Sequence, residues 1–406
     1  MIGGRGLVRA HFCVTIVTGL AAAVLAACGT TSPSEGVKPT LAAHASLPPL
    51  AASDFPAPPI STPSPWSELV STESAAPPHS GIGIQMIGDA VAYRAGFVAV
   101  GEDVHGDGSV NGAIWASPDG RSWSMVDVRQ GDLADAAVHQ VATDGQRLVA
   151  IGSSGTAFDA PADPVRILWL SGDGVTWRRL PEASQAFADI SGLQIVGGAS
   201  GFVAWGDANG GTVIFHSNDG LRWDRSPTGT GLAGMQIRAV KPYRGGFVAV
   251  GAQLPPTEAA GSVLSNGGPD GPAAAWWSPD GRSWGDADVD PGYGLLRLEV
   301  GAQGLLAFGG GSCSGCVGPA IVWRSDDGRR WRQLGSDVAD WPAYGSDGAR
   351  IIRFDYQGSG AVSVSTDGEA WQRLGDVGIA STSGLTVGAN GVLVSEGEAF
   401  WYLAAR

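Results

Sequence analysis

The chain has 406 residues, a formal net charge of −14 and 44% hydrophobic residues. Its 63 glycines, its 25 prolines and a charged fraction of only 16% disfavour a helical protein. The 15 tryptophans need a large core, which excludes global disorder. Lys38 and Lys241 are the only lysines among 25 basic residues, and the acidic balance excludes nucleic acid as a partner.

The first 27 residues have the features of a signal peptide. Arg5 and Arg9 precede an apolar stretch from Phe12 to Val24, which is shorter than the roughly 20 residues of a membrane-spanning helix. The segment ends Leu25-Ala26-Ala27-Cys28, which resembles the lipobox of bacterial lipoproteins. The resemblance implies that Cys28 carries a lipid anchor and that the protein is extracytoplasmic at the bacterial cell membrane. Ordinary secretion with an incidental cysteine is the alternative.

Residues 28–64 are rich in proline, serine, threonine and alanine and predict a linker after the lipidated cysteine. Proline keeps such a segment semi-extended at about 3 Å per residue. We therefore expect one folded domain over residues 65–406.

A heptapeptide with the pattern S-x-D-G-x-x-W recurs six times along this domain. Successive aspartates are 54, 46, 61, 47 and 40 residues apart, a spacing that suits the blades of a β-propeller. The copies are Ser117–Trp123, Ser171–Trp177, Ser217–Trp223, Ser278–Trp284, Ser325–Trp331 and Ser365–Trp371. Their aspartates are Asp119, Asp173, Asp219, Asp280, Asp327 and Asp367.

Asp-Gly between two apolar runs predicts a tight hairpin turn, because glycine accepts the positive φ that the turn needs. The serine and aspartate oxygens can accept backbone N–H groups of that turn, so we expect these residues to be structural. An aromatic residue often lies two positions before the serine, as at Trp115 and Trp169, and we expect it to pair across the hairpin with the tryptophan.

Ahead of each hairpin lies an apolar run such as Gly96–Gly101, Gly201–Gly206 or Gly246–Gly251. These runs do not alternate, which is typical of a strand buried on both faces. A variable stretch such as 235–240 precedes the run, and we expect it to be the innermost strand of a four-stranded antiparallel blade.

Three further strands are expected after the sixth repeat, at 384–387, 392–394 and 400–403. The seventh blade then lacks only its outer strand, and Trp66–Val70 resembles the outer strands that begin at the heptapeptide tryptophans. The sequence therefore predicts an all-β, seven-bladed β-propeller in which this N-terminal strand completes the last blade. A six-bladed ring with loose C-terminal strands is the alternative.

The heptapeptides resemble the Asp-box, or BNR repeat, of sialidases and many other propeller proteins, one residue shorter than the usual S-x-D-x-G-x-T-W. The resemblance covers nearly all of residues 66–406 and implies that the six aspartates lie on outer hairpins, away from the ligand face. Sialidases also share an Arg-Ile-Pro segment, an arginine triad and a tyrosine nucleophile paired with glutamate. This chain has no Arg-Ile-Pro segment, and no mature tyrosine has a glutamate in a recognisable arrangement.

The loops that join second to third strands are the expected ligand face, with Glu102–Gly112 the first and Gln253–Ala273 the longest. Within the first, Asp103, His105 and Asp107 loosely match a calcium loop, but histidine replaces a ligand and the partnering glutamate is missing. We therefore expect no metal or other cofactor, with calcium as the alternative. Aromatic candidates for stacking on a ligand are Tyr293, Trp341 and Tyr344.

Cys313 and Cys316 form a C-x-x-C motif in a glycine-rich segment. In an exported protein this motif predicts a disulfide that fixes the shape of a loop. A redox motif would need a helix start, and a zinc site would need two further ligands.

We therefore expect a monomeric, non-catalytic binding or assembly scaffold for a protein or a cell-wall glycan, anchored to the membrane by its lipid. A glycoside hydrolase of the exo-sialidase type is the alternative function. A purely structural surface protein without a discrete ligand is a third hypothesis.

Overall fold

The computed structural model describes residues 66–406, with gaps at 76, 78–82, 108, 156–164, 209–210, 227–233, 254–270, 293, 311–319, 337–341, 357, 380 and 397–398. The expectations for the signal peptide, the linker and five individual residues lie outside the described residues; these five are Cys28, Tyr293, Cys313, Cys316 and Trp341. Within the described part of the chain, no helix combines the length and the apolar character needed to cross a membrane.

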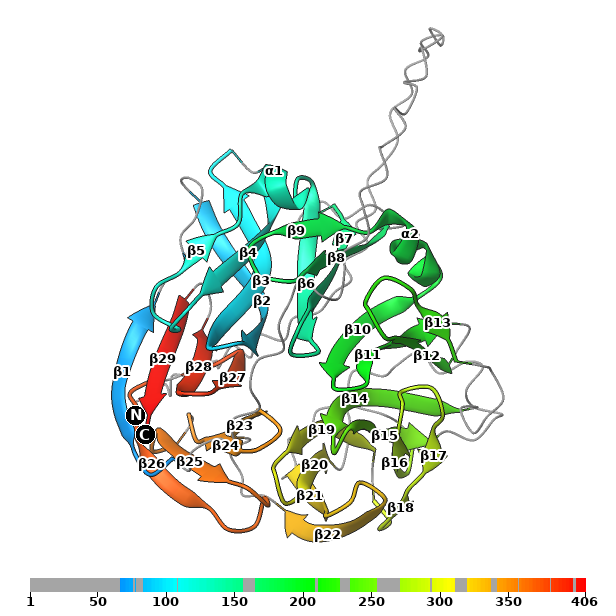
Figure 1. The fold of residues 1–406 in the computed structure, drawn as a ribbon. Helices are drawn as coiled ribbons and strands as arrows, with labels where there is room; N and C mark the ends of the chain where they lie inside the picture. Colours follow the sequence, from blue (N-terminus) through cyan, green and yellow to red (C-terminus); the bar gives the residue numbers. More distant parts are fainter. Residues whose placement is uncertain are drawn as a thin grey trace, which may run out of the picture. The chain divides into compact units, whose positions relative to one another are not determined.

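Seven β-sheets are arranged in a ring around a central channel (Figure 1). The innermost strands contact one another in sequence order, and the contact of β27 with β2 closes the circle. This arrangement confirms the predicted seven-bladed β-propeller and excludes the six-bladed alternative. The innermost strands are β2 (Gly83–Tyr93), β6 (Ala136–Thr143), β10 (Ser191–Gly198), β14 (Met235–Tyr243), β19 (Leu295–Val300), β23 (Ala343–Ser346) and β27 (Gly384–Gly388).

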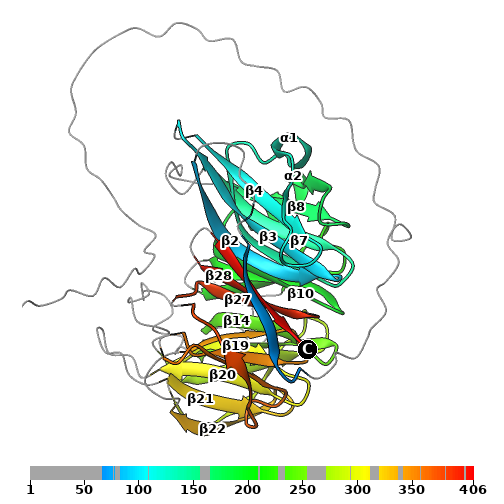
Figure 2. The ribbon, with the colours of Figure 1, turned by 90° about the vertical axis from the view of Figure 1, so that its left-hand side faces the viewer.

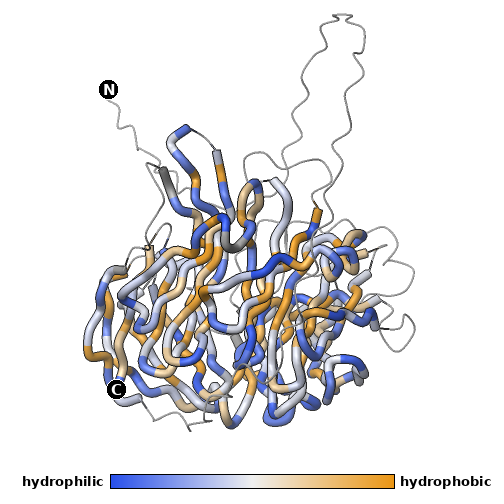
Figure 3. Tube along the Cα trace, turned by 45° about the horizontal axis from the view of Figure 1, so that its top comes forward, coloured by the Kyte–Doolittle hydropathy of each residue, from blue (hydrophilic) through white to orange (hydrophobic). Residues whose placement is uncertain are grey.

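The second strand of each blade is the apolar run that the sequence singled out. In β3 the first eight residues are all buried, because both faces of the strand pack against neighbouring blades. Figure 3 shows that apolar residues follow the strands of the blades. The second strands are β3 (Gly96–His105), β7 (Leu148–Ser154), β11 (Gly201–Ala208), β15 (Gly246–Gln253), β20 (Leu305–Gly310), β24 (Ile351–Phe354) and β28 (Gly391–Glu396).

The third strand of blades 1 to 6 ends in the serine of a heptapeptide. These third strands are β4 (Val110–Ser117), β8 (Arg166–Ser171), β12 (Gly211–Ser217), β16 (Ala273–Ser278), β21 (Ala320–Ser325), β25 (Ala361–Ser365) and, in blade 7, β29 (Ala399–Ala405). The outer strands are β5 (Ser124–Met125), β9 (Trp177–Arg179), β13 (Asp224–Arg225), β17 (Gly285–Asp286), β22 (Arg330–Ser336), β26 (Gln372–Asp376) and, in blade 7, β1 (Leu69–Ala75).

The N-terminal strand β1 completes blade 7, as the sequence predicts. It pairs antiparallel with β29 from Leu69 opposite Ala405 to Ala75 opposite Phe400 (Figure 2). The strand begins three residues later than expected, because Trp66 turns inward and is only 4% exposed. The backbone N–H of Ser67 donates to the carbonyl of Arg406 at 2.6 Å, so the two ends of the domain are joined directly.

Blade 5 departs from the four-stranded pattern. The connection from blade 4 forms a short strand, β18 (Asp288–Val289), which pairs parallel with the outer strand β22. The other connections that form helices are short: α1 (Val128–Gly131), α2 (Pro181–Ser184) and a 3₁₀ turn at Gln185–Phe187.

The six heptapeptides form the same hydrogen-bonded turn. The serine Oγ accepts the N–H of the turn glycine at 2.8–2.9 Å. The aspartate Oδ1 accepts the N–H groups of the two residues that follow the glycine, and in blade 3 Asp219 accepts from Leu221 at 2.8 Å and Arg222 at 3.0 Å. Burial acts to raise the pKa of Asp219, but these donors outweigh it and hold the pKa below its usual value.

Each turn also contacts the preceding blade. The turn glycines have φ between 75° and 81°, and a Cβ atom on any of them would lie within 3.0 Å of a side chain of the preceding blade, such as Val149 for Gly220. The heptapeptide tryptophans enter the same interfaces, and Trp123 stacks on Phe400 of blade 7 at 4.7 Å. The expected pairing of Trp115 with Trp123 is wrong, because the strand register places Met125 opposite Trp115. The core is therefore distributed between the blades.

Candidate functional site

The two ends of the propeller differ in what they carry. Each heptapeptide serine lies opposite the start of a second strand, as Ser117 lies opposite Phe97. All six turns are therefore at one end of the ring, and the loops between second and third strands are at the other. We refer to this second end as the loop face.

The first expected loop on this face, Glu102–Gly112, is mostly strand, so that prediction was wrong. Glu102 pairs with Gly112 and Asp103 with Asn111, because the long strand β2 keeps β3 in the sheet as far as His105 and β3 in turn pairs with β4. Only residues 106–109 separate β3 from β4.

The residues that resembled a calcium loop do not come together at one point: two lie in a strand and one lies in the turn that follows it. The Asp103 side chain is 2% exposed and lies 3.9 Å from the Nε2 atom of His105, whose ring is also within 2.9 Å of the Asn111 amide. Asp107 lies in the turn, where hydrogen bonds from Ser109 lower its pKa. Among the described residues, no three His, Cys, Asp or Glu side chains are grouped as a metal site would require.

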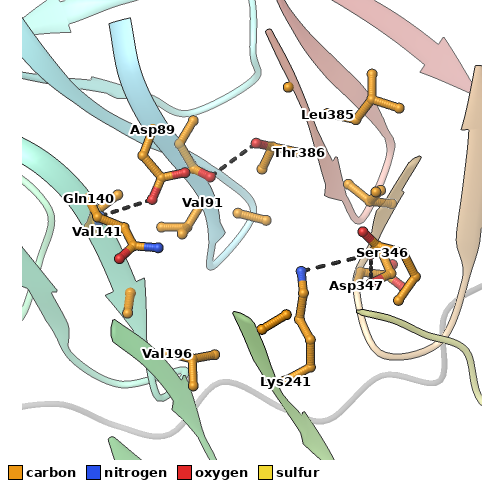
Figure 4. A pocket seen from close by; sticks show the side chains of 18 of the residues that line it. Asp89, Val91, Gln140, Val141, Val196, Lys241, Ser346, Asp347, Leu385 and Thr386 are labelled. Carbon is orange, nitrogen blue, oxygen red and sulfur yellow. Dashed lines mark hydrogen bonds and ion pairs between the residues drawn. The ribbon is translucent and has the colours of Figure 1, made fainter. Parts of the chain in front are cut away.

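A cavity of about 580 Å³ occupies the central channel (Figure 4). Its walls come from the innermost strands of all seven blades. Side chains that reach it include Asp89, Gln140, Lys241, Glu299 and Thr386.

A β-bulge determines which side chains face this cavity. The register of the innermost strand shifts by one residue after Ile87, after Val138 and at corresponding places in other blades, which re-aims the side chain that follows. We call the residue after the bulge, and its counterparts in blades 6 and 7, the channel position. In every blade, the residue at the channel position pairs with a residue of the second strand. This partner stands three residues after the first apolar residue of that second strand. Its occupants are Asp89, Gln140, Gln194, Ala239, Arg297, Ala343 and Gly384.

At two channel positions the side chain joins adjacent blades. Asp89 Oδ2 accepts the N–H of Val141 at 3.0 Å, and Gln140 Oε1 accepts the N–H of Ile195 at 2.9 Å. On the other side of blade 1, Thr386 Oγ1 of blade 7 donates to the carbonyl of Ala90 at 3.0 Å. These polar groups fix the blades to one another at the channel wall.

The position of Asp89 in the channel wall changes the acidity of its carboxyl group. Burial raises the pKa of its carboxyl from 3.8 to about 6, against the opposing effects of the Val141 and Ala90 N–H groups and the Lys241 charge. A raised pKa means that the folded protein binds the proton more tightly than the unfolded chain does. The contribution of Asp89 to stability is therefore complete below about pH 4 and is lost as the pH rises through about 6.

We expect Asp89→Asn to stabilise the protein at pH 7 and to have little effect at pH 4. The amide keeps an acceptor for Val141 but carries no charge, and we expect a gain of about 1–2 kcal/mol, since one pKa unit corresponds to about 1.4 kcal/mol and channel water reduces the full value. Urea unfolding at both pH values measures the difference. Asp286→Asn, at an exposed carboxyl on β17, is the control. Equal effects of Asp89→Asn at pH 4 and pH 7 would contradict the assignment.

The basic side chains of the channel wall come from blades 4 and 5. Lys241 Nζ lies 3.8 Å from Glu299 Oε2, and this oxygen also accepts the hydroxyl of Ser346 at 2.5 Å. The Arg238 Nε is buried and has no partner among the described residues. Arg297 is exposed, and no described residue pairs with its guanidinium.

Beside the channel lies a second, smaller cavity of about 240 Å³ between blades 5, 6 and 7. Arg297, Tyr344, Ser383 and Gly384 line both cavities, so the two lie next to each other. We call the smaller cavity the side cleft. Its walls are Leu296, Arg297, Phe308, Ala343, Tyr344, Tyr356 and 382–384.

Tyr344, an expected ligand-face residue, lies in the wall of the side cleft. Its ring is 4.4 Å from Phe308 and 6.1 Å from Trp371. The cleft is at the loop face, because it lies where β20 ends and β19 and β23 begin.

The channel residues were not identified from the sequence. The innermost strands are the most variable part of each repeat, and a bulge reverses which side chain faces inward. One signal was available: counting from the first apolar residue of each second strand finds the partner of every channel position.

The fold and the channel together define this protein as a seven-bladed β-propeller. No protein-family model matches the chain, and no curated protein matches it. Solved structures that resemble it include virginiamycin B lyase from Staphylococcus aureus, with 10% identity, a TM-score of 0.48 and coverage of 82% of this chain and 99% of the lyase.

Two other solved structures show the range of proteins with this likeness. The β-propeller domain of the Trilobed protease from Pyrococcus furiosus has 9% identity and a TM-score of 0.47, covering 79% of this chain and 93% of that domain. A Trypanosoma rangeli sialidase mutant has 13% identity and a TM-score of 0.37, covering 76% of this chain and 60% of the sialidase. At such identities the likeness concerns the fold, and it assigns no activity to this chain.

Proposed function

We propose that this protein is a non-catalytic, lipid-anchored, extracytoplasmic β-propeller that serves as a binding or assembly scaffold for a protein or a cell-wall glycan. The observation that supports the absence of catalysis is that the channel carboxylates already have hydrogen-bond or ion-pair partners within the protein. Asp89 accepts the N–H of Val141, Glu299 is bonded to Lys241 and Ser346, and Asp347 is bonded to Arg350 at 2.6 Å. Most glycoside hydrolases need two carboxyl groups that are free to flank the scissile bond, and a sialidase needs a free glutamate beside its tyrosine nucleophile.

The anchor part of the proposal depends on the resemblance of Leu25–Cys28 to a lipobox. A lipid on Cys28 and a proline-rich segment after it would hold the propeller away from the membrane surface. Labelling with a fatty-acid analogue tests this part: the label should be lost in Cys28→Ala, and retained label would refute the anchor.

A glycoside hydrolase of the exo-sialidase type is the second candidate, and one observation favours it. The pKa of Asp89, at about 6, is in the range that a general acid uses near neutral pH. The described lining of the two cavities, however, contains two arginines, Arg238 and Arg297, where a carboxylate-binding triad would need three.

Turnover of fluorogenic glycosides, including sialosides, separates the two functions. We expect the folded protein to release no more fluorophore than the heat-denatured protein does. We also expect the folded protein to bind to a glycan array or to a protein ligand. Release that disappears in Asp89→Asn, but not in Asp286→Asn, would establish the hydrolase and refute the scaffold.

A further inference from the structure

The seven blades provide an internal comparison at the channel position. Blades 1 to 3 have acidic or amide side chains there, and two of these, Asp89 and Gln140, accept a backbone N–H of the next blade. Blade 5 has Arg297, which cannot accept a hydrogen bond. The connection to blade 6 is made instead by Ser346, whose Oγ accepts the N–H of Val300 at 3.1 Å. Arg297 is therefore not needed to hold the blades together.

The same comparison explains why the side cleft exists. The channel positions of blades 6 and 7, which follow Arg297 around the ring, are Ala343 and Gly384. Small residues at both places leave open the volume that larger side chains would fill. Arg297 lines one side of the opening, and Phe308, Tyr344 and Tyr356 supply aromatic walls.

We propose that the side cleft binds a peptide segment that presents a carboxylate to Arg297 and an apolar side chain to the aromatic walls. This inference rests on the proposed scaffold function and assigns its ligand a chemical class and a place. A guanidinium binds a carboxylate through two parallel hydrogen bonds, and Arg297 breaks no hydrogen bond to a described residue when that partner arrives. The carboxylate comes from a chain terminus or from an acidic side chain.

The hydrogen bonding of the cleft favours a peptide over a sugar. Thr382 Oγ1 donates to the carbonyls of Gly384 and Ser395, at 3.0 and 3.1 Å, and Ser383 Oγ is 3.2 Å from the Ser395 carbonyl. These hydroxyls are already used within the protein. The many hydroxyls of a sugar ring would find few partners here and would pay the cost of lost hydration. An apolar side chain beside a carboxylate makes no such demand.

Fluorescence polarisation with defined peptides tests the proposal. The first probe is a labelled pentapeptide of glycine and serine that ends in phenylalanine with a free carboxylate; the second is its amide. A third, also amidated, has glutamate before the phenylalanine and identifies an acidic side chain as the source. We expect one of the carboxylate-bearing probes to bind about 10- to 100-fold more tightly than the plain amide, as for a hydrogen bond to a charged group.

Arg297→Ala should remove this preference, and Arg297→Gln, which keeps the length of the side chain, should do the same. Ala343→Leu should weaken all three probes by filling the cleft, with Arg297 intact. The matched control is Arg330→Ala, at an outer-strand arginine whose side chain is 85% exposed, and it should bind as the unchanged protein does. Thermal melting of each variant verifies folding.

Equal binding of the probes with and without a carboxylate, or an Arg297→Ala variant that keeps the preference, would overturn the proposal. So would tighter binding of an oligouronate than of any peptide, since that result assigns the cleft to an acidic glycan. The glycoside turnover assay is independent of these results: a protein without turnover and without peptide binding keeps the scaffold function and loses this site.

Discussion

Replacing Trp66 with alanine is expected to lower the free energy of unfolding by about 3–5 kcal/mol, which corresponds to about 4–7 °C in melting temperature for a domain of this size. Trp66 is 4% exposed and packs in a cluster with Ile352, Phe354 and Leu403 of blades 6 and 7. The guanidinium of Arg350 lies 3.8 Å from the centre of its ring. The substitution removes a large buried side chain at the place where the ring closes.

The same arginine makes the loss larger than the cavity alone. Arg350 is 4% exposed, and its Nη2 atom donates to the carbonyl of Gly388 at 3.1 Å and pairs with Asp347. Without the tryptophan ring, water reaches this buried pair and weakens the contact between blades 6 and 7.

Val70→Ala is the matched control for Trp66→Ala, since Val70 lies in the same closing strand with 55% of its surface exposed. Its unfolding curve should differ little from that of the unchanged protein. Urea unfolding, followed by tryptophan fluorescence and circular dichroism, gives both values. If the two variants lose the same small amount of stability, the strand closes the ring through its backbone alone and the role assigned to Trp66 is wrong.

Gly220→Ala is expected to cost about 2–5 kcal/mol, through two separate effects. The residue has φ of 75°, which costs an L side chain about 1–2 kcal/mol. The added methyl group would also lie 2.6 Å from Val149 Cγ2 and 3.1 Å from Leu170 Cδ1, and such overpacking typically costs about 1–3 kcal/mol.

Gly145→Ala separates the two effects. Gly145 has φ of 90° in the turn between β6 and β7, and no atom lies within 4 Å of the position of its Cβ. It should therefore show the backbone cost without the contact with a neighbouring blade. Chemical denaturation of both variants measures the difference, and equal losses would mean that the heptapeptide turns do not press on the preceding blade.

The number and order of the blades could be predicted because the information is local. An Asp-Gly turn specifies its hairpin through contacts within seven residues, and six copies at blade spacing specify a ring. The strand that completes blade 7 was found by likeness to Trp123–Val126 and Trp371–Leu374, although its pairing begins only at Leu69.

The candidate site could not be predicted in the same way, because it depends on contacts between blades. Arg297 and Asp89 occupy the same position in two repeats. Only the structure shows that Asp89 accepts a hydrogen bond from Val141, whereas Arg297 has no partner among the described residues. The side cleft is formed by the absence of side chains at Ala343 and Gly384, and a small residue in a variable strand gives no signal of its own. The length of β3 was missed for a related reason: its last residues are polar, and the partner strand β2 keeps them in the sheet.

The hydrogen bond from Ser67 to Arg406 has a consequence for how the protein reaches its folded state. These residues are 339 positions apart, and β29, the partner of β1, follows all the other described strands along the chain. Blade 7 cannot be completed until β29 has been synthesised, although the hairpins of the other blades need only neighbouring sequence. Joining such distant segments is slow, because the chain entropy of closing the loop is lost before the contacts form. The edge of β29 therefore stays open to other chains until β1 arrives, and a chain truncated before β29 leaves β1 without its partner.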